Sequence, residues 1–293
     1  MDKAPIGTPE QLRDPDYTPP LAQAIPLGIQ HVLAMFISNV TPAIIIAGVA
    51  GFGFGSNSPH FPNLIYMIQM SMLFAGIATL FQTIGFGPVG ARLPIVQGTS
   101  FDFSLAAVIG FCLMAIISAI DTVGDVSGIT KGGAGREASD VEIKGATFAD
   151  GLGTALAGIF GGLPNTSFSQ NVGLVAMTGV MSRRVVTSGA VFLIGCGLIP
   201  KFGAIISTVP IEVLGGGVIV MFGMVVAAGV SMLADVDWSR RNMVIFAISL
   251  SLGLGLQLEP GALQHLPATA KVLLSSGLLP AAALAIVLNL AIP

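Results

Sequence analysis

An adjacent carboxamide pair, Gln170-Asn171, stands in a stretch of sequence that is otherwise largely apolar. Carboxamides at membrane depth are costly unless they are buried in protein and hydrogen-bonded. Thr166-Ser167-Phe168 favours an extended conformation, and Asn171 through Thr178 can open a short helix. The pattern therefore predicts a strand that runs into a half-helix, the kind of discontinuous element that forms substrate sites in secondary transporters.

The amides of Gln170 and Asn171 offer donors and acceptors in one plane, which suits the edge of a nucleobase. The alternative is a structural role, as a helix cap and an interhelical hydrogen bond. Pro94 to Phe101 resembles Pro164 to Phe168, since both carry a proline and then Thr-Ser-Phe before an apolar run. Two such elements could meet at the membrane midplane, as inverted repeats do.

Three carboxylates are candidates for binding a substrate N–H, a proton or a coupling cation. Asp121 and Asp125 are spaced i, i+4 on one helix face, and Asp150 begins the next apolar segment. The alternatives are that Asp121 and Asp125 lie at the water interface, and that Asp150 lies near a helix N-terminus, where the dipole favours it. His31 falls inside the first apolar segment, where it could titrate or serve as a hydrogen-bonded structural residue.

The elements that position these residues are those of a polytopic membrane protein. The chain has 293 residues, of which 53% are hydrophobic and 9% charged, against roughly 25% charged in soluble domains. A membrane helix needs about 20 mostly apolar residues. That length gives an all-α fold of about nine membrane segments, near 22–48, 62–86, 95–124, 146–162, 171–182, 184–204, 211–234, 241–257 and 270–292.

The polar stretches divide these segments. Residues 1–21 are predicted to form a soluble cytoplasmic tail, and Val126 to Gly145 a solvated loop. Basic residues mark the cytoplasmic side of a membrane protein. Arg92 and Lys131 would lie on opposite sides if 95–124 crossed once, so that segment is either a re-entrant hairpin or lacks part of its sequence.

Composition also excludes several functions. A net charge of −3 without a basic tract argues against nucleic-acid binding. Nucleotide-binding, hydrolase and metalloprotease motifs are absent, so we expect no enzyme, no cofactor and no bound metal. Cys112 and Cys196 lie in apolar runs and are expected to pack there.

The run Gln170-Asn171-x-Gly173-x-x-x-x-Thr178-Gly179 resembles the signature of the nucleobase–ascorbate transporter family, also called nucleobase:cation symporter-2. Gln30-His31, Gln97 to Phe101, Asp121 to Asp125 and Ala149-Asp150-Gly151 are similar to further motifs of that family. The resemblance implies a multi-pass cell-membrane symporter for a purine such as xanthine or uric acid, coupled to H⁺ or Na⁺. It also implies a homodimer and an inverted-repeat core with two short strands at the midplane leading into half-helices. A uracil-type permease is the alternative, although uracil members tend to carry glutamate at the position of Gln170.

The resemblance also assigns roles. It implies a substrate-binding site of Phe101, Asp121, Phe168, Ser169, Gln170 and Asn171, with His31, Asp125, Asp150 and Thr178 in support or cation coupling. The family has glutamate where this chain has Asp121, and it has fourteen segments. Segments four to seven have no counterpart here, which implies a core domain (22–204) shortened near 101–110 and a partial gate domain (205–293). A remnant that binds a base without transporting it is therefore a second hypothesis.

Overall fold

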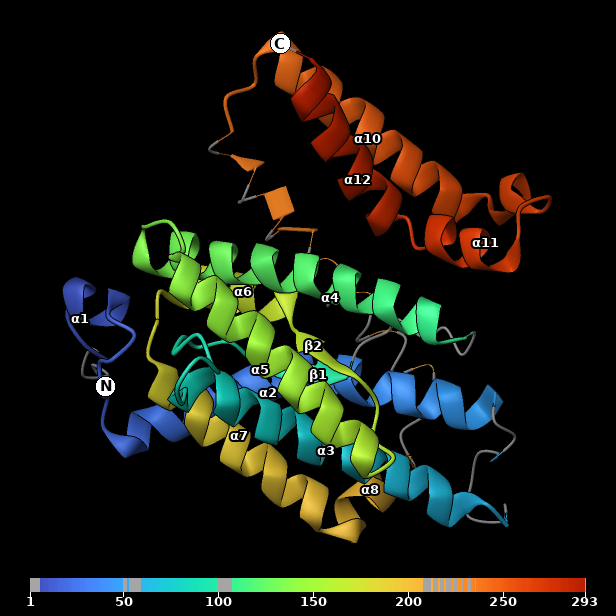
Figure 1. Ribbon diagram of the computed structural model, residues 1–293. Helices are drawn as coiled ribbons and strands as arrows, with labels where there is room; N and C mark the ends of the chain where they lie inside the picture. Colours follow the sequence, from blue (N-terminus) through green and yellow to red (C-terminus); the bar gives the residue numbers. More distant parts are fainter. Residues whose placement is uncertain are drawn as a thin grey trace. The chain divides into compact units, whose positions relative to one another are not determined.

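The computed structural model describes residues 6–49, 52, 59–99, 107–207 and 236–292, together with scattered positions between 212 and 234. The described chain is mostly helical with two short strands (Figure 1). Its elements are α1 (Pro9–Arg13), α2 (Leu21–Val49), α3 (Phe61–Ile84), β1 (Gln97–Thr99), α4 (Ala107–Ile129), the π-helical turn η1 (Thr130–Ala134), α5 (Asp140–Ile159), β2 (Asn165–Ser167), α6 (Ser169–Thr178), α7 (Arg183–Leu198), α8 (Pro200–Ser207), α10 (Arg240–Leu258), the 3₁₀ turn η2 (Pro260–Leu263), α11 (Ala268–Ser275) and α12 (Leu278–Ala291).

The chain divides into two compact units. Unit 1 comprises Met1–Phe101 and Ala119–Leu233, and unit 2 comprises Asp102–Ser118 and Ala234–Pro293. The division passes through α4. The core and gate domains expected at 22–204 and 205–293 stay a prediction, because these units are defined by contacts and not by movement.

Three helices in the described residues are long and apolar enough to cross a membrane: Leu21–Gly48, Phe61–Ile84 and Arg240–Leu258. Helices α7 and α8 form a fourth candidate span, broken by an 89° bend. α5 has four charged residues in its first eleven positions, and it is therefore not apolar enough to count as a membrane-spanning helix. The expected segment 211–234 lies mostly outside the described residues, so the count of about nine stays a prediction.

Unit 1 is built on close approaches between α7 and the helices α2 and α3. A Cβ at Gly28 of α2 would lie 2.4 Å from the carbonyl oxygen of Val185, and one at Gly189 would lie 2.5 Å from that of Gly28. Gly76 of α3 meets the carbonyl of Ala190 in the same way, at 2.8 Å. Small residues let backbones approach in membrane helices, where packing replaces the hydrophobic effect.

The two strands pair with each other. They form an antiparallel ribbon in which Gln97 lies opposite Ser167 and Thr99 opposite Asn165. An added Cβ at Gly98 would lie 2.0 Å from the ring of Phe168, which precedes α6, and 2.9 Å from Met35 of α2. β2 continues into α6, a helix of 10 residues, so the predicted strand and half-helix are confirmed there. The residues after β1, 100–106, lie outside the described residues.

The expected loop from Val126 to Gly145 is wrong. α4 continues to Ile129, η1 adds another turn, and α5 begins at Asp140, which leaves only 135–139 between helices. Ser139 and Glu142 form a capping box, in which the side chain of each accepts a hydrogen bond from the backbone N–H of the other at the start of α5. Arg136 adds an ion pair to Glu142 at 2.5 Å, so the charged residues stabilise helix ends rather than a loop.

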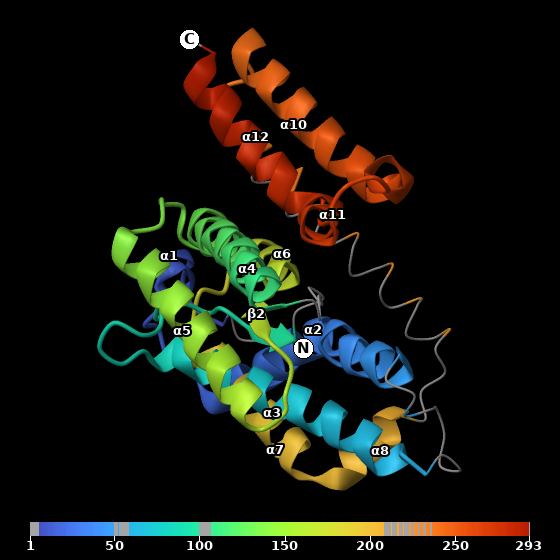
Figure 2. The same ribbon diagram turned by 45° about the vertical axis from the view of Figure 1, so that its right-hand side comes forward.

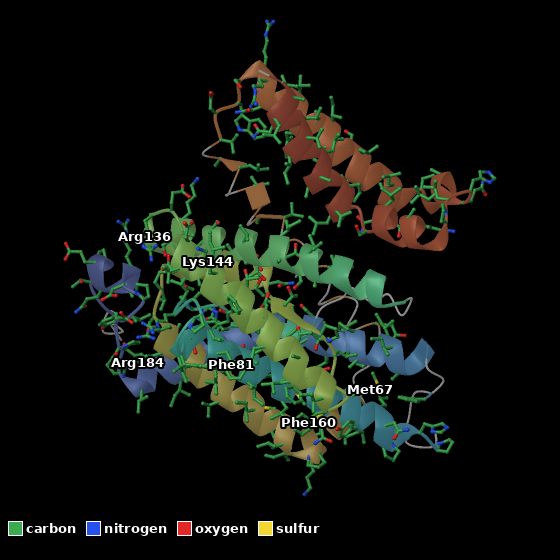
Figure 3. All side chains as sticks on the ribbon, viewed as in Figure 1. Met67, Phe81, Arg136, Lys144, Phe160 and Arg184 are labelled. Carbon is green, nitrogen blue, oxygen red and sulfur yellow. The ribbon has the colours of Figure 1, made fainter. Side chains whose placement is uncertain are left out.

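Several basic residues of unit 1 lie together at one end. The amide of Gly90 donates to the carbonyl of Gly145 at 2.8 Å, which brings the Arg92 and Lys144 segments together. Figure 3 shows Arg136, Lys144 and Arg184 at this end, near α1, and Met67 and Phe160 toward the opposite end. The segments that carry Arg92 and Lys144 therefore lie at the same end of unit 1.

The segment expected as a tail is docked at that end. The amides of Met181 and Arg183 donate to the carbonyls of Leu12 and Pro15, at 2.9 and 3.0 Å. Leu12 packs against a small buried cluster that includes Val180 and Val185. Residues 6–20 thus cover the connection between α6 and α7.

Unit 2 contains a hairpin of α10 and α12 joined through η2 and α11 (Figure 2). A Cβ at Gly253 would lie 2.6 Å from the carbonyl oxygen of Gly277 and 2.7 Å from the Cβ of Ala281. Arg241 donates to the carbonyls of Asn289 and Ile292, at 2.6 and 2.9 Å, and so satisfies the end of α12.

Candidate functional site

The first turn of α6 presents Gln170. The side chain is 7% exposed, and its carboxamide has no hydrogen bond to any described residue. Phe168, just before the helix, is extended and buried in the apolar core beside Met35. Gln170 is therefore held by its backbone while its donors and acceptors stay available.

Asn171 is tied to two other elements. Its Oδ1 contacts Nδ1 of His31 on α2, and its Nδ2 donates to the carbonyl of Pro94 at 2.5 Å. Because the amide NH₂ is used by Pro94, the Asn171 oxygen accepts, and His31 must carry its proton on Nδ1. The structure thus brings together His31 and Asn171, the residues expected to support the site.

Asp125 is buried, at 5% exposed, and accepts a hydrogen bond from Ser167 Oγ of β2 at 2.6 Å. Of the two roles left open, the water-interface reading is therefore wrong for Asp125. Asp121, one turn earlier on α4, is half-buried and lies close enough to Asp150 to interact electrostatically.

Asp150 lies in the middle of α5, ten residues after Asp140, so the helix N-terminus reading is wrong. Its Oδ2 accepts from Thr122 Oγ1 of α4, and its Oδ1 has no partner among the described residues. Thr122 and Ser167 connect Asp150 to Asp125, because Ser167 Oγ also lies 3.5 Å from Thr122 Oγ1. Asp125 and Asp150 therefore belong to one buried polar network.

Two expected residues lie apart from this network. Thr178 Oγ1 donates to the carbonyl of Leu174 at 2.8 Å, at the far end of α6 and about 14 Å from its first turn. That contact is the ordinary back-bonding of a helical threonine. Phe101 lies outside the described residues, and Ser169 opens α6 beside Gln170.

Sequence reasoning missed three residues that hold the ribbon. Asn39 of α2 accepts from the backbone amide of Thr99 at 2.8 Å, and Thr79 of α3 accepts from that of Gln97 at 2.9 Å. Asn165 Nδ2 lies 3.4 Å from the carbonyl of Gly153. A signal was present in Asn39, because it lies eight residues after His31 on the same apolar helix.

Known proteins match this chain. A family model described as the permease family (Xan_ur_permease) matches residues 22–110 and 102–261, two stretches that overlap where the sequence predicts missing segments. The chain is 36% identical over 193 residues to a xanthine permease of Bacillus subtilis and 38% over 191 residues to the uric acid permease PucK of the same organism. Each match covers 64% of this chain. It is 36% identical over 269 residues, 83% of the chain, to the nucleobase transporter PlUacP of Paenibacillus larvae.

The chain spans 43% and 44% of the lengths of the two Bacillus permeases and 61% of the Paenibacillus transporter. The family match covers well over half of the chain. With the paired strands, the half-helix and the Gln170-Asn171 motif in place, the chain belongs to the permease family.

Proposed function

We propose that this protein binds a purine nucleobase of the xanthine or uric acid type at the first turn of α6. The observation that carries the proposal is the buried Gln170 carboxamide, which is available for hydrogen bonding beside the fixed Asn171. A carboxamide can donate to and accept from neighbouring groups on one edge of a purine. The relatives named as xanthine and uric acid permeases support the substrate class.

In this proposal Asp121 provides a carboxylate for a substrate N–H, together with the backbone near Phe101 and Ser169. Asp125 and Asp150 would carry the coupling H⁺ or Na⁺, with His31 in support. The ribbon would mark the membrane midplane of an inverted-repeat core that moves by alternating access. The basic end of unit 1 would face the cytoplasm, together with the N-terminus, and the chain would form a homodimer.

Binding is tested by the melting temperature of the purified protein in detergent with xanthine, uric acid or uracil. A ligand at one hundred times its Kd stabilises the folded state by about 2.7 kcal/mol. We expect a shift with a purine and its loss in Gln170→Ala. The matched control is Gln69→Ala on α3, which removes a hydrogen bond to the carbonyl of Gly197 but should keep the ligand shift. A shift that persists in Gln170→Ala contradicts the site.

A second candidate is a protein that binds a base without transporting it. The observation in its favour is that the family model matches the chain in two stretches, 22–110 and 102–261, which overlap where the core is expected to be shortened. Uptake of labelled xanthine, uric acid and uracil by cells without their own carriers separates the two. Uptake above background under a pH or Na⁺ gradient supports symport, whereas a thermal shift without uptake supports binding alone.

A further inference from the structure

The connection between α6 and α7 is buried, and it is buried by the N-terminal segment (residues 6–20). Ser182 of this connection is 1% exposed, and its Oγ donates to the carbonyl of Tyr17 at 2.6 Å. The backbone amides on either side of Ser182 donate to the carbonyls of Leu12 and Pro15. The N-terminal segment therefore accepts three hydrogen bonds from the connection and from the first residue of α7. A buried donor that loses its acceptor destabilises the fold, so this contact is specific.

The N-terminal segment is ordered by contacts of its own. Thr8 and Gln11 form a capping box around the first turn of α1. Tyr17 Oη donates to the carbonyl of Ile6 at 2.7 Å and so joins the two ends of the segment. Local order of this kind lowers the entropy cost of docking on another element.

The chain that follows this segment holds the other end of α6. α2 begins at Leu21, directly after the N-terminal segment, and its His31 contacts Asn171 in the first turn of α6. The last turn of α6 lies about 14 Å from the first and leads into the buried connection. Residues 6–31 therefore contact the half-helix at its first turn and immediately after its last.

Leu12 is the apolar contact that joins these elements. It packs against a cluster made of Val180 from the connection, Ala24 from α2 and Val185 from α7. Each of these three residues is at least 97% buried, with exposed fractions of 3%, 2% and 0%. Leu12 is thus the side chain whose replacement should release the N-terminal segment from the end of α6.

We propose that the N-terminal segment positions the purine site by fixing the end of α6. A helix of 10 residues moves as one body, so a displacement of its end also displaces Gln170 in its first turn. Leu12 is a positioning residue in this proposal and does not touch the base. The proposal rests on the proposed function, because it names the part of the chain that places the carboxamide. By linkage, a bound purine must strengthen the docking of the segment by the same factor by which docking strengthens purine binding.

The first experiment is amide hydrogen exchange of the purified full chain in detergent without ligand. Leu12→Gln is expected to speed exchange at the amides of Met181 and Arg183 and within α6, and to leave α3 unchanged. Arg13→Gln places the same side chain at the exposed neighbouring position and is the matched control. Leu12→Met keeps an apolar contact and should retain the wild-type exchange.

A second variant releases the connection without changing the N-terminal segment. Ser182→Ala removes the hydrogen bond to the carbonyl of Tyr17. It should speed exchange within α6 in the same way as Leu12→Gln. Unchanged exchange in α3 shows in each case that unit 1 is still folded.

The second experiment measures the Kd for xanthine and for uric acid well below the melting temperature, where the protein is folded. We expect Leu12→Gln to raise the Kd about tenfold and Arg13→Gln to leave it unchanged. Saturating purine should slow exchange at the amides of Met181 and Arg183 in the wild type by the same factor. A segment that only stabilises the fold would lower the melting temperature without changing the Kd or this ligand-dependent protection.

Unchanged exchange within α6 in both Leu12→Gln and Ser182→Ala overturns the proposal. An unchanged purine Kd with the segment released, or protection of Met181 and Arg183 that bound purine does not alter, also overturns it. If the wild type binds neither purine, the proposed function fails. The ligand-free exchange within α6 then decides by itself whether the N-terminal segment positions the half-helix.

Discussion

The membrane-type helices of the two units differ in how much of their apolar surface the chain itself covers. The most apolar stretches of α2 and α3 are 56% and 50% buried, whereas that of α10 is 11% buried. In unit 1 the covering comes from α7 and from the ribbon, whose hydrogen bonds tie α2, α3, α4 and α5 together. In unit 2, α10 has α12 as its principal neighbour.

This difference in buried apolar surface shows that unit 1 packs its long helices against its own elements, whereas unit 2 leaves most of the surface of α10 exposed. Unit 1 buries polar groups that only a fixed scaffold can satisfy, which is what a binding site requires. The hairpin of unit 2 exposes large apolar side chains on several faces: Val244, Ile248, Leu250, Leu252, Leu254, Ile286, Val287 and Leu290. Exposed apolar area of this kind marks a surface that contacts another surface.

The largest effect is expected from overpacking unit 1 at Gly189→Leu. A Cβ there lies 2.5 Å from the backbone oxygen of Gly28, so α2 and α7 must move apart. Overpacking costs typically 1–3 kcal/mol, and we expect about 3 kcal/mol because backbone cannot yield. The measurement is the unfolding midpoint in detergent.

The control is Gly195→Leu on the same helix, where an added Cβ meets nothing within 4 Å. It should change the midpoint little. Equal destabilisation by the two variants would show that helix propensity, and not the approach of α2 to α7, sets the stability of unit 1.

A smaller effect, about 2 kcal/mol, is expected in unit 2 from Gly253→Leu. Its Cβ meets the backbone oxygen of Gly277 and also the side chain of Ala281, which can shift. Gly255→Leu, which meets nothing within 4 Å, is the control. The purine-induced shift should survive Gly253→Leu, because Gln170 and Asn171 belong to unit 1. If the shift is lost, the two units do not act independently.

The sequence predicted the two short strands and the half-helix after β2, because local signals define them. Thr166-Ser167-Phe168 favours extension, and the proline before each strand starts the element. It did not predict that Asn39, Thr79 and Asn165 hold the ribbon, since these contacts join elements that are far apart in the sequence. The loop expected at 126–145 is wrong, because charged residues are typical of solvated loops but here Ser139, Arg136 and Glu142 cap the start of α5.

That cap gives a third prediction. Partial burial of Glu142 would raise its pKa, but hydrogen bonds from Arg136 and Ser139 outweigh burial and lower the pKa from 4.5 to about 2. A lowered pKa stabilises the fold above the unfolded value of 4.5, and this contribution is lost as the pH falls from 4.5 to 2. Ser139→Ala should cost about 1 kcal/mol at neutral pH.

The melting temperature of the wild type should fall as the pH is lowered from 4.5 to 2. Glu142→Gln should lose the part of this fall that comes from Glu142. Asp140→Asn changes a carboxylate of the same helical turn that makes no side-chain hydrogen bond among the described residues. It controls for the loss of one negative charge from the first turn of α5. An unchanged profile in Glu142→Gln would assign that acid sensitivity to other carboxylates.

The smallest effect is expected where the N-terminal segment docks on unit 1. Asp16 pairs with Arg183 at 2.6 Å, but the Asp16 side chain is 70% exposed. Exposed ion pairs contribute about 0.5 kcal/mol, and salt screens them. Asp16→Asn should therefore lower the unfolding midpoint slightly at low ionic strength and leave it unchanged at high salt.

Asp14→Asn is the matched control, because the amide oxygen can still accept the hydrogen bond from the backbone of Asp16, which measures 2.9 Å. The backbone bonds from Met181 and Arg183 to Leu12 and Pro15 do not depend on either charge. A large, salt-dependent loss of stability in Asp16→Asn would mean that charge, rather than these backbone bonds and the packing of Leu12, holds the segment over the end of α6. The docking of residues 6–20 on unit 1 would then depend on ionic strength and not on buried surface.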